Sequence, residues 1–361
     1  MFGNIIKVIF IVLFLSGSTF LYASEGHKDK KEDTHHTEKF DPGSFIIEHI
    51  GDSYEWHITT IGETHITVPL LILVYSNNSG FNVFFSNRFH HGHSSYKNFS
   101  IAQEGTDKGR IIETLEDGTI QKPIDISITK NVAAIFVSII ILLWIFISIA
   151  NKYKKNVNKA PSGFQNLFEP IILFVRDDIA KPAIGEKKYE KFLPFLLSVF
   201  FFIWINNMLG LIPIFPFGAN ITGNIAVTFV LAFFTFIIIT INGNKVYWKH
   251  IFNTPGVPWW LKIPLPLMPF IELLGMLTKP FVLMVRLFAN ISAGHIITMG
   301  FFSLIFVFGN ISVYSGYGIS VLSVAFTIFM TFLELLVAFI QAYVFTLLSA
   351  LYFGMAVEEH H

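Results

Sequence analysis

One arginine lies inside an apolar run of the sequence and offers its most distinctive chemistry. The run from Pro280 to His295 reads PFVLMVRLFANISAGH, with Arg286 in its middle. A guanidinium stays charged at biological pH, and holding it at membrane depth costs about 2.5–3.5 kcal/mol on insertion scales. Such a residue is expected to face a counter-charge or a water-filled cavity. The structural alternatives are a snorkelling side chain or an ion pair with Glu334.

Polar residues recur along this apolar segment at helical spacing. Between Ile263 and Phe308 the ionisable residues are Glu272, Lys279, Arg286 and His295. The first three are seven apart, a spacing that drifts only about 20° per step and predicts one polar stripe. Asn290 falls on nearly the same face as Arg286, whereas His295 points to the opposite side. Lys279 and Glu272 either line an ion pathway or form a structural ion pair or interfacial anchor.

The last apolar segment carries a matching pair of polar residues. Glu334 and Gln341 are seven apart and share a helix face. We expect Glu334 to pair with His295, and Gln341 with Arg286, on the preceding helix. A glutamate–histidine pair at membrane depth suits a proton relay, because small environmental shifts move a histidine through neutral pH. Taken alone, His295 is more typical of a hydrogen-bonded packing residue.

Composition sets the class of protein that must position these groups. Of 361 residues, 53% are hydrophobic and only 14% charged, against about 25% in soluble domains. This composition predicts an all-α polytopic membrane protein. A net charge of zero gives no attraction to nucleic acid, and the absence of cysteine excludes disulfides and thiolate chemistry. No glycine-rich phosphate loop is present, so we expect no bound nucleotide. We also expect no cofactor, and no metal site is assigned.

The N-terminal part divides into two segments by composition. Residues 1–24 read as a signal peptide, with an uncleaved first membrane helix as the alternative. Residues 25–125 then form a small extracytoplasmic region that is partly disordered and partly β, with strand-like runs at Thr67–Tyr75 and Phe81–Phe85. A cluster of histidines in it either chelates a divalent metal or is solvated, in a polar loop without nearby acids: His90, His91 and His93.

Residues 126–361 are expected to form the membrane domain. About five membrane-embedded helices are predicted, at Val132–Ala150, Leu193–Leu211, Ile225–Ile241, Ile263–Phe308 and Ile319–Phe353. The last two exceed one upright span, so they form a long tilted hairpin, joined by a loop at Gly309–Gly318, unless the first breaks near Pro280. Lysines after Ala150 place that end in the cytoplasm, followed by an amphipathic surface helix from Phe164 to Ile179. This topology gives an extracytoplasmic N-terminus and a cytoplasmic C-terminus.

Four sequence motifs together resemble subunit a of the F-type ATP synthase, a bacterial form with an extra N-terminal region. They are RLFAN followed by AGH from Arg286, ELLVAFIQAYVFTLL from Glu334, WINNMLGLIP from Trp204, and NIAVT from Asn224. The resemblance covers about residues 125–357. Many bacterial members have glutamate where this chain has His295 and histidine where it has Glu334. The exchanged pair, as in mitochondrial forms, still offers a relay.

The resemblance implies a non-catalytic stator subunit in the cell inner membrane that offers two proton half-channels to the rotating c-ring. Arg286 is then the charge barrier between the channels, with Gln341 opposite it and Asn290 beside it, and His295 and Glu334 carry protons in the inlet. Peripheral stalk subunit b and membrane lipid are the other implied partners. Three further polar residues either line a channel or make helix-end hydrogen bonds: Asn207, Asn224 and Thr228.

Two functions of other classes compete with this interpretation. A self-contained secondary transporter or channel would use Arg286 to bind an anionic substrate. A membrane-anchored binding protein would place its function in the N-terminal region. The first predicts transport by the purified chain alone, and the second predicts that Arg286 variants stay active.

Overall fold

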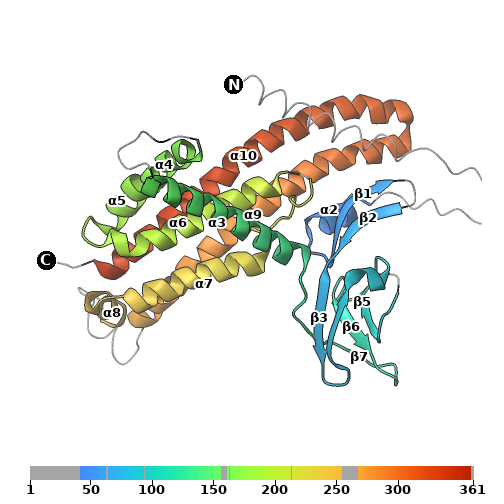
Figure 1. Ribbon diagram of the computed structural model, residues 1–361, viewed down its shortest axis with the longest axis horizontal. Helices are drawn as coiled ribbons and strands as arrows, with labels where there is room; N and C mark the ends of the chain where they lie inside the picture. The colour runs from blue at the N-terminus through green and yellow to red at the C-terminus, as the bar shows by residue number, and fades with distance from the viewer. Residues whose placement is uncertain are drawn as a thin grey trace, which may run out of the picture.

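The computed structural model describes residues 41–61, 64–92, 94–155, 161, 163–212, 214–253 and 267–358. The predicted signal peptide, the charged segment after it and His93 lie outside these residues. Figure 1 shows a group of long helices with a region of short strands at one end, opposite the C-terminus. The sequence accounts for this division, since long uninterrupted apolar runs are confined to the part after Lys130.

The N-terminal region consists of one helix and three small antiparallel sheets. Strands β1 and β2 form a hairpin, and the other two sheets have the orders β4-β3-β8 and β5-β6-β7. The predicted run Thr67–Tyr75 is divided between two strands. The elements are α2 (Pro42–Ile50), β1 (Glu55–Ile61), β2 (Thr64–Pro69), β3 (Leu71–Ser76), β4 (Gly80–Phe85), η1 (Ser86–Phe89), β5 (Phe99–Ile101), β6 (Ile111–Thr114), β7 (Ile120–Gln121) and β8 (Ile124–Asp125).

Five helices in the described part of the chain are long and apolar enough to cross a membrane: α3, α6, α7, α9 and α10. They confirm the predicted polytopic, mostly helical fold. The short helix α8 was not predicted from the sequence. The helices are α3 (Lys130–Lys155), α4 (Phe164–Phe174), η2 (Val175–Ala180), α5 (Lys181–Ile184), α6 (Tyr189–Gly210), α7 (Ile225–Asn242), α8 (Lys245–Phe252), α9 (Leu267–Ile311) and α10 (Val313–Val357).

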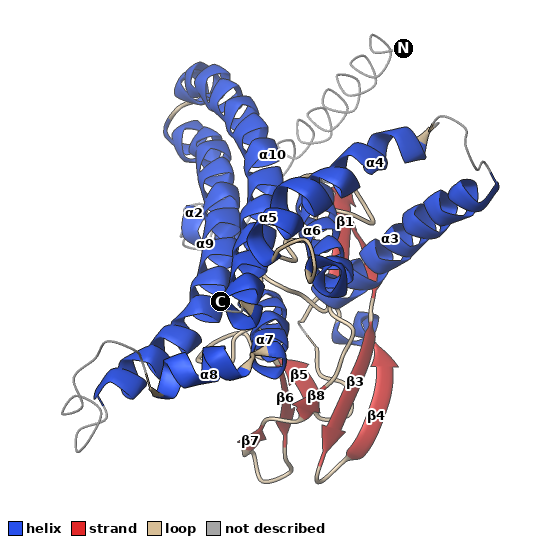
Figure 2. Cartoon of the chain, turned by 90° about the vertical axis from the view of Figure 1, so that its left-hand side faces the viewer, coloured by secondary structure: helices blue, strands red, loops and turns tan. Residues whose placement is uncertain are grey.

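Helices α9 and α10 form a hairpin of unusual length. Each has 45 residues and is therefore about 67 Å long, more than twice the roughly 30 Å hydrocarbon core of a bilayer. They lie side by side along their length in both views (Figures 1 and 2). Helix α9 continues through Pro280 without a break. Of the two predicted alternatives, the unbroken helix is therefore the correct one.

The predicted loop Gly309–Gly318 is wrong, because the hairpin turns at Ser312 alone. Gly316 packs so closely on α9 that a Cβ there would lie 2.9 Å from the Gly309 Cα. The Ser315 hydroxyl donates to the Phe308 carbonyl (2.9 Å), which also accepts the Ser312 backbone N–H (3.1 Å). Two facing glycines and one hydroxyl thus let a second helix start at once where composition alone indicates a loop.

The last turns of α10 are enclosed by other helices. Phe353 stacks on Phe192 of α6 with ring centroids 4.9 Å apart. The final α10 carbonyls accept hydrogen bonds from the Asn244 backbone N–H, to Ala356 (2.9 Å), and from the Lys188 ammonium, to Val357 (2.8 Å). These donors satisfy helix-end groups that would otherwise be buried without partners.

The predicted amphipathic segment from Phe164 to Ile179 is helical and runs through α4 and η2. Phe168, Val175 and Ile179 are buried on its inner side. Hydrogen bonds from Arg176 and then Lys181 hold the pKa of Asp177 well below its usual range. The segment therefore pairs Asp177 with Arg176 and Lys181, while its apolar side packs on the other helices.

Gly354→Ala tests the close packing between α10 and α5. A Cβ at position 354 would lie 2.0 Å from the Ala183 carbonyl oxygen, so the two helices must separate. We expect a destabilisation of about 1–3 kcal/mol, as overpacking generally causes. The measurement is thermal unfolding of the purified protein in detergent. Gly318→Ala is the control, because nothing lies within 4 Å there and helix propensity favours alanine; equal stability of both variants would contradict the packing.

Candidate functional site

His295 of α9 and Glu334 of α10 face each other inside the hairpin. The His295 Nδ1 and Glu334 Oε1 atoms are 3.8 Å apart, and the two side chains are only 19% and 11% exposed. The Thr298 hydroxyl donates to the same Glu334 oxygen (3.0 Å). Because 3.8 Å exceeds a direct hydrogen bond, a proton passing between them needs a rotamer change or one bridging water. The expected pairing of these two residues is thus present.

A pocket of about 150 Å³ opens beside this pair. Its walls are mostly apolar, with four polar groups among them, all of which the sequence had singled out: Asn207, Asn290, His295 and Glu334. Few polar groups converging in an apolar pocket are typical of a binding or transfer site. The pocket therefore joins residues of α6, α9 and α10 that are up to 131 positions apart in sequence.

Both polar atoms of the Asn207 side-chain amide form hydrogen bonds. Its Nδ2 donates to the Ala338 carbonyl of α10 (3.3 Å), and its Oδ1 accepts a hydrogen bond from the Thr222 hydroxyl. Asn207 and Thr222 are 5% and 1% exposed. This network fixes the wall of the pocket opposite α9.

Asn224 and Thr228 have local structural contacts. Asn224 caps α7, accepting a hydrogen bond from the Ala226 backbone N–H (2.9 Å). The fully buried Thr228 hydroxyl donates to the Ile225 carbonyl (3.1 Å). Neither residue lines the pocket. Their geometry fits the helix-end alternative, and a channel role for them stays a prediction.

Arg286 lies exposed on the outside of the hairpin. Its neighbours Leu283 and Leu287 are buried against the other helices at 1% each, while Val282 and Val285 are exposed beside it. In the described part of the chain no carboxylate pairs with Arg286, which removes the ion pair with Glu334 as an explanation. The apolar α9 surface therefore presents one unpaired cation.

The expected hydrogen bond between Gln341 and Arg286 does not form. Gln341 is 6% exposed and lies among buried residues of α10. Gln341 lies three residues after Ala338 and therefore on the same face of α10. Ala338 on this face accepts a hydrogen bond from Asn207 of α6. The seven-residue spacing places Gln341 and Glu334 on one face of α10, but it does not identify the side chain that Gln341 contacts.

Lys279 and Glu272 lie half-buried nearer the start of α9. The Lys279 ammonium sits 5.6 Å from the Tyr352 ring centroid, a cation–π contact. Burial, together with the charge of Glu272, raises the pKa of Tyr247 in α8. These residues form a polar group near the start of α9. Along the helix, this group precedes Arg286, whereas His295 follows it.

Three polar residues of the site gave no signal in the sequence. They are Thr298, which donates to Glu334; Thr222, which donates to Asn207; and Ser292, whose hydroxyl donates to the Gly223 carbonyl (3.3 Å). Hydroxyls are common in membrane helices, so only their packed positions distinguish them. Spacing from His295 draws attention to Thr298 alone, three residues away on the same side.

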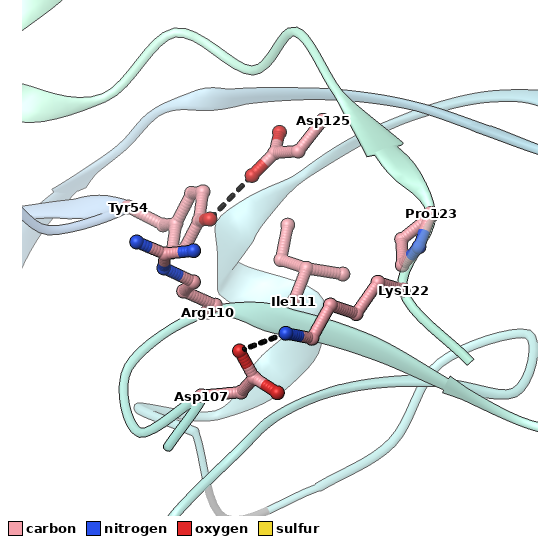
Figure 3. A pocket seen from close by; sticks show the side chains of 7 residues that line it. All are labelled: Tyr54, Asp107, Arg110, Ile111, Lys122, Pro123 and Asp125. Carbon is pink, nitrogen blue, oxygen red and sulfur yellow. Dashed lines mark hydrogen bonds and ion pairs between the residues drawn. The ribbon is translucent and has the colours of Figure 1, made fainter. Parts of the chain in front are cut away.

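A larger pocket of about 270 Å³ lies in the N-terminal region (Figure 3). Its charges are mostly paired internally, since Lys122 binds Asp107 (2.7 Å) and the Tyr54 hydroxyl donates to Asp125. Burial and this hydrogen bond raise the pKa of Tyr54. The contacts fit a structural role.

The histidine cluster has an acidic residue beside it at His91, which the sequence did not predict. His91 Nδ1 lies 2.7 Å from Glu55 Oε2, so an acid is close by, contrary to the sequence-based interpretation. The acid comes from β1, 36 residues earlier, and sequence proximity gave no sign of it.

Five membrane-capable helices among the described residues, with a titratable pair between the two longest, define a polytopic membrane protein. The profile of the family described as ATP synthase A chain matches residues 132–354, and the chain belongs to this family. Membership supports a proton-translocating role in the membrane sector of ATP synthase, with partners there such as the c-ring. A second profile, a domain of unknown function, matches residues 45–131.

Similar proteins from several bacteria belong to the same family. The chain is 45% identical over 245 residues to ATP synthase subunit a of Chloroherpeton thalassium, covering 65% of this chain and 69% of that protein. It is 45% identical to ATP synthase subunit a 2 of Prosthecochloris aestuarii, with coverages of 65% and 70%. It is 40% identical to ATP synthase subunit a of Myxococcus xanthus, with coverages of 74% and 84%.

Gly294→Ala tests the geometry of the His295–Glu334 pair. A Cβ there would lie 2.9 Å from Glu334 Oε1, so the carboxylate must leave Thr298. We expect proton-driven ATP synthesis by the complete complex to fall about tenfold, equal to about 1.4 kcal/mol. Gly300→Ala in the same helix, with no atom within 4 Å, is the matched control. Unchanged synthesis with Gly294→Ala would show that this arrangement is not used.

Proposed function

We propose that this chain is the non-catalytic stator subunit that supplies two proton half-channels to the c-ring, with Arg286 as the charge barrier between them. The observation that carries the proposal is the division of α9 into two flanks. Arg286 lies exposed on one, and His295 lies with Glu334 on the other. One helix thus presents a fixed cation outward and a titratable pair inward.

The inlet half-channel would pass through the pocket beside His295 and Glu334. A carboxylate and an imidazole within 4 Å can exchange a proton by way of water or a rotamer change. Asn207 and Asn290 supply polar groups that hold water in an otherwise apolar wall. We assign the exit half-channel to the polar group at the start of α9, with Glu272 and Lys279.

The barrier follows from the charge on Arg286. Each ring subunit would carry a carboxylate at membrane depth, which turns through lipid only when it is protonated, because an exposed charge there costs several kcal/mol. Facing Arg286, the carboxylate ionises and releases its proton to the exit. The same cation repels a bare proton and closes the direct route between the channels.

The membrane orientation follows from the charges at the end of α3. Lys152, Lys154 and Lys155 lie in its last turn, so we place that end and the C-terminus in the cytoplasm. The region 25–125 then lies outside, ahead of the membrane domain 126–361 and after a signal peptide 1–24. In bacteria this membrane is the inner membrane, and peripheral stalk subunit b is the second protein partner that we propose.

Arg286→Ala tests the barrier directly. We expect proton-driven ATP synthesis to fall at least a hundredfold in vesicles that carry the complete complex, with the complex still assembled. Loss of the repelling charge should also raise passive proton leakage through the membrane sector. Synthesis and leakage are measured on the same vesicles, and Lys154→Ala, which removes an exposed cation at the end of α3, is the comparison variant.

Coupled synthesis retained by Arg286→Ala would overturn the proposal. Transport of an anionic substrate by the purified chain alone would instead favour the secondary transporter. Activity that depends only on the N-terminal region would favour a membrane-anchored binding protein.

A further inference from the structure

The N-terminal region is packed firmly against the membrane helices through Trp56 of β1. Trp56 is 5% exposed and lies in a cluster with Ala134 of α3 and with Ala219 and Ile221 of the loop between α6 and α7. Its ring also meets Phe215 of that loop edge-on, with centroids 5.2 Å apart. A buried tryptophan makes this a specific contact rather than a loose tether.

The same loop reaches the candidate proton site one residue after Ile221. Ile221 belongs to the same buried cluster as Trp56, and the next residue, Thr222, donates its hydroxyl to Asn207. Asn207 in turn donates to the Ala338 carbonyl, and both residues line the pocket beside Glu334. The Gly223 carbonyl accepts the Ser292 hydroxyl of α9 (3.3 Å). A continuous series of contacts therefore joins the N-terminal region to the pocket.

Two further contacts fix the position of the N-terminal region. The Asp52 carboxylate accepts hydrogen bonds from the Asn131 backbone N–H (3.0 Å) and the Thr129 hydroxyl (2.7 Å) at the start of α3. Phe45 of α2 packs near Phe306 of α9, with ring centroids 6.4 Å apart. Because the region is held at α3, α9 and the α6–α7 loop, it can transmit a fixed position to that loop.

We propose that the N-terminal region, for which no role is assigned, holds the proton site in its working geometry, with Trp56 as a positioning residue acting through Thr222 on Asn207. This inference rests on the proposed function of the His295–Glu334 pocket. Removal of the indole leaves a cavity under Ile221, into which the loop relaxes. Thr222 then withdraws from Asn207, and small misplacements in a transfer site cost large factors in rate.

A double-mutant cycle tests the proposal in the complete complex in vesicles. We expect Trp56→Ala and Thr222→Val each to lower proton-driven ATP synthesis about tenfold. The double variant should be no worse than either, because both break one series of contacts. Trp56→Phe, which keeps an aromatic ring in the cluster, should restore most of the activity. Phe81→Ala is the control, since Phe81 of β4 is 62% exposed and faces away.

A second measurement does not depend on proton transport. The chain has no cysteine, so Leu211→Cys places a single thiol in the pocket wall. Trp56→Ala should change the rate at which a small maleimide labels that thiol at least threefold, and Phe81→Ala should leave it unchanged. If Trp56→Ala does not assemble, Trp56→Phe replaces it in the cycle, where its smaller loss must likewise vanish in the Thr222→Val background.

Strictly additive losses, or full activity and unchanged labelling in Trp56→Ala, would overturn the positioning role. A different result is expected if the proposed proton-channel function itself is wrong. Arg286→Ala would then retain coupled synthesis, while the labelling rate would still report whether Trp56 holds the pocket.

Discussion

A charge at membrane depth is the constraint on which the rest of this structure depends. An isolated arginine in lipid is costly, and Arg286 has no carboxylate partner among the described residues. The cost is compatible with folding only if a partner outside the chain, or water, meets the guanidinium. The long hairpin leaves the Arg286 flank of α9 free to meet such a partner. The opposite flank of α9 carries His295, which faces Glu334 of α10. The helices around it then serve to hold that flank in place, through Asn207 of α6 and the capped end of α10.

The sequence predicted the features that depend on composition and helical period. The five long helices follow from uninterrupted apolar runs, and the meeting of His295 and Glu334 follows from spacing within two antiparallel helices. Spacing gives a face but not the neighbour on that face. Gln341 was therefore assigned to Arg286, although Gln341 is buried and Arg286 is exposed. The sequence also failed to predict the tight turn at Ser312. Glycines there indicate a loop by composition, but Gly309 and Gly316 instead allow the two helices to pack closely.

The N-terminal region was the least predictable part. Its strands are short, and its contacts join residues far apart in the chain, such as Asp52 with Asn131, or Trp56 with Ile221. Nothing in local sequence marks these pairs. They give the region a physical relation to the proton site, because the loop that it covers also supplies Thr222 to Asn207. The region that matches a domain of unknown function thus contacts the same elements that hold the titratable groups.

Site-directed cross-linking to the ring subunit is the measurement that tests the two-flanked helix most directly. Ile297 lies eleven residues after Arg286 and so returns to within about 20° of its direction, whereas Ile296 points about 80° away. Both are isoleucines of α9 with similar exposure, 44% and 47%, and each can carry the only cysteine of the chain. The account predicts efficient cross-linking from Ile297→Cys and little from Ile296→Cys. Equal or reversed yields would contradict the assignment of the Arg286 flank to the ring.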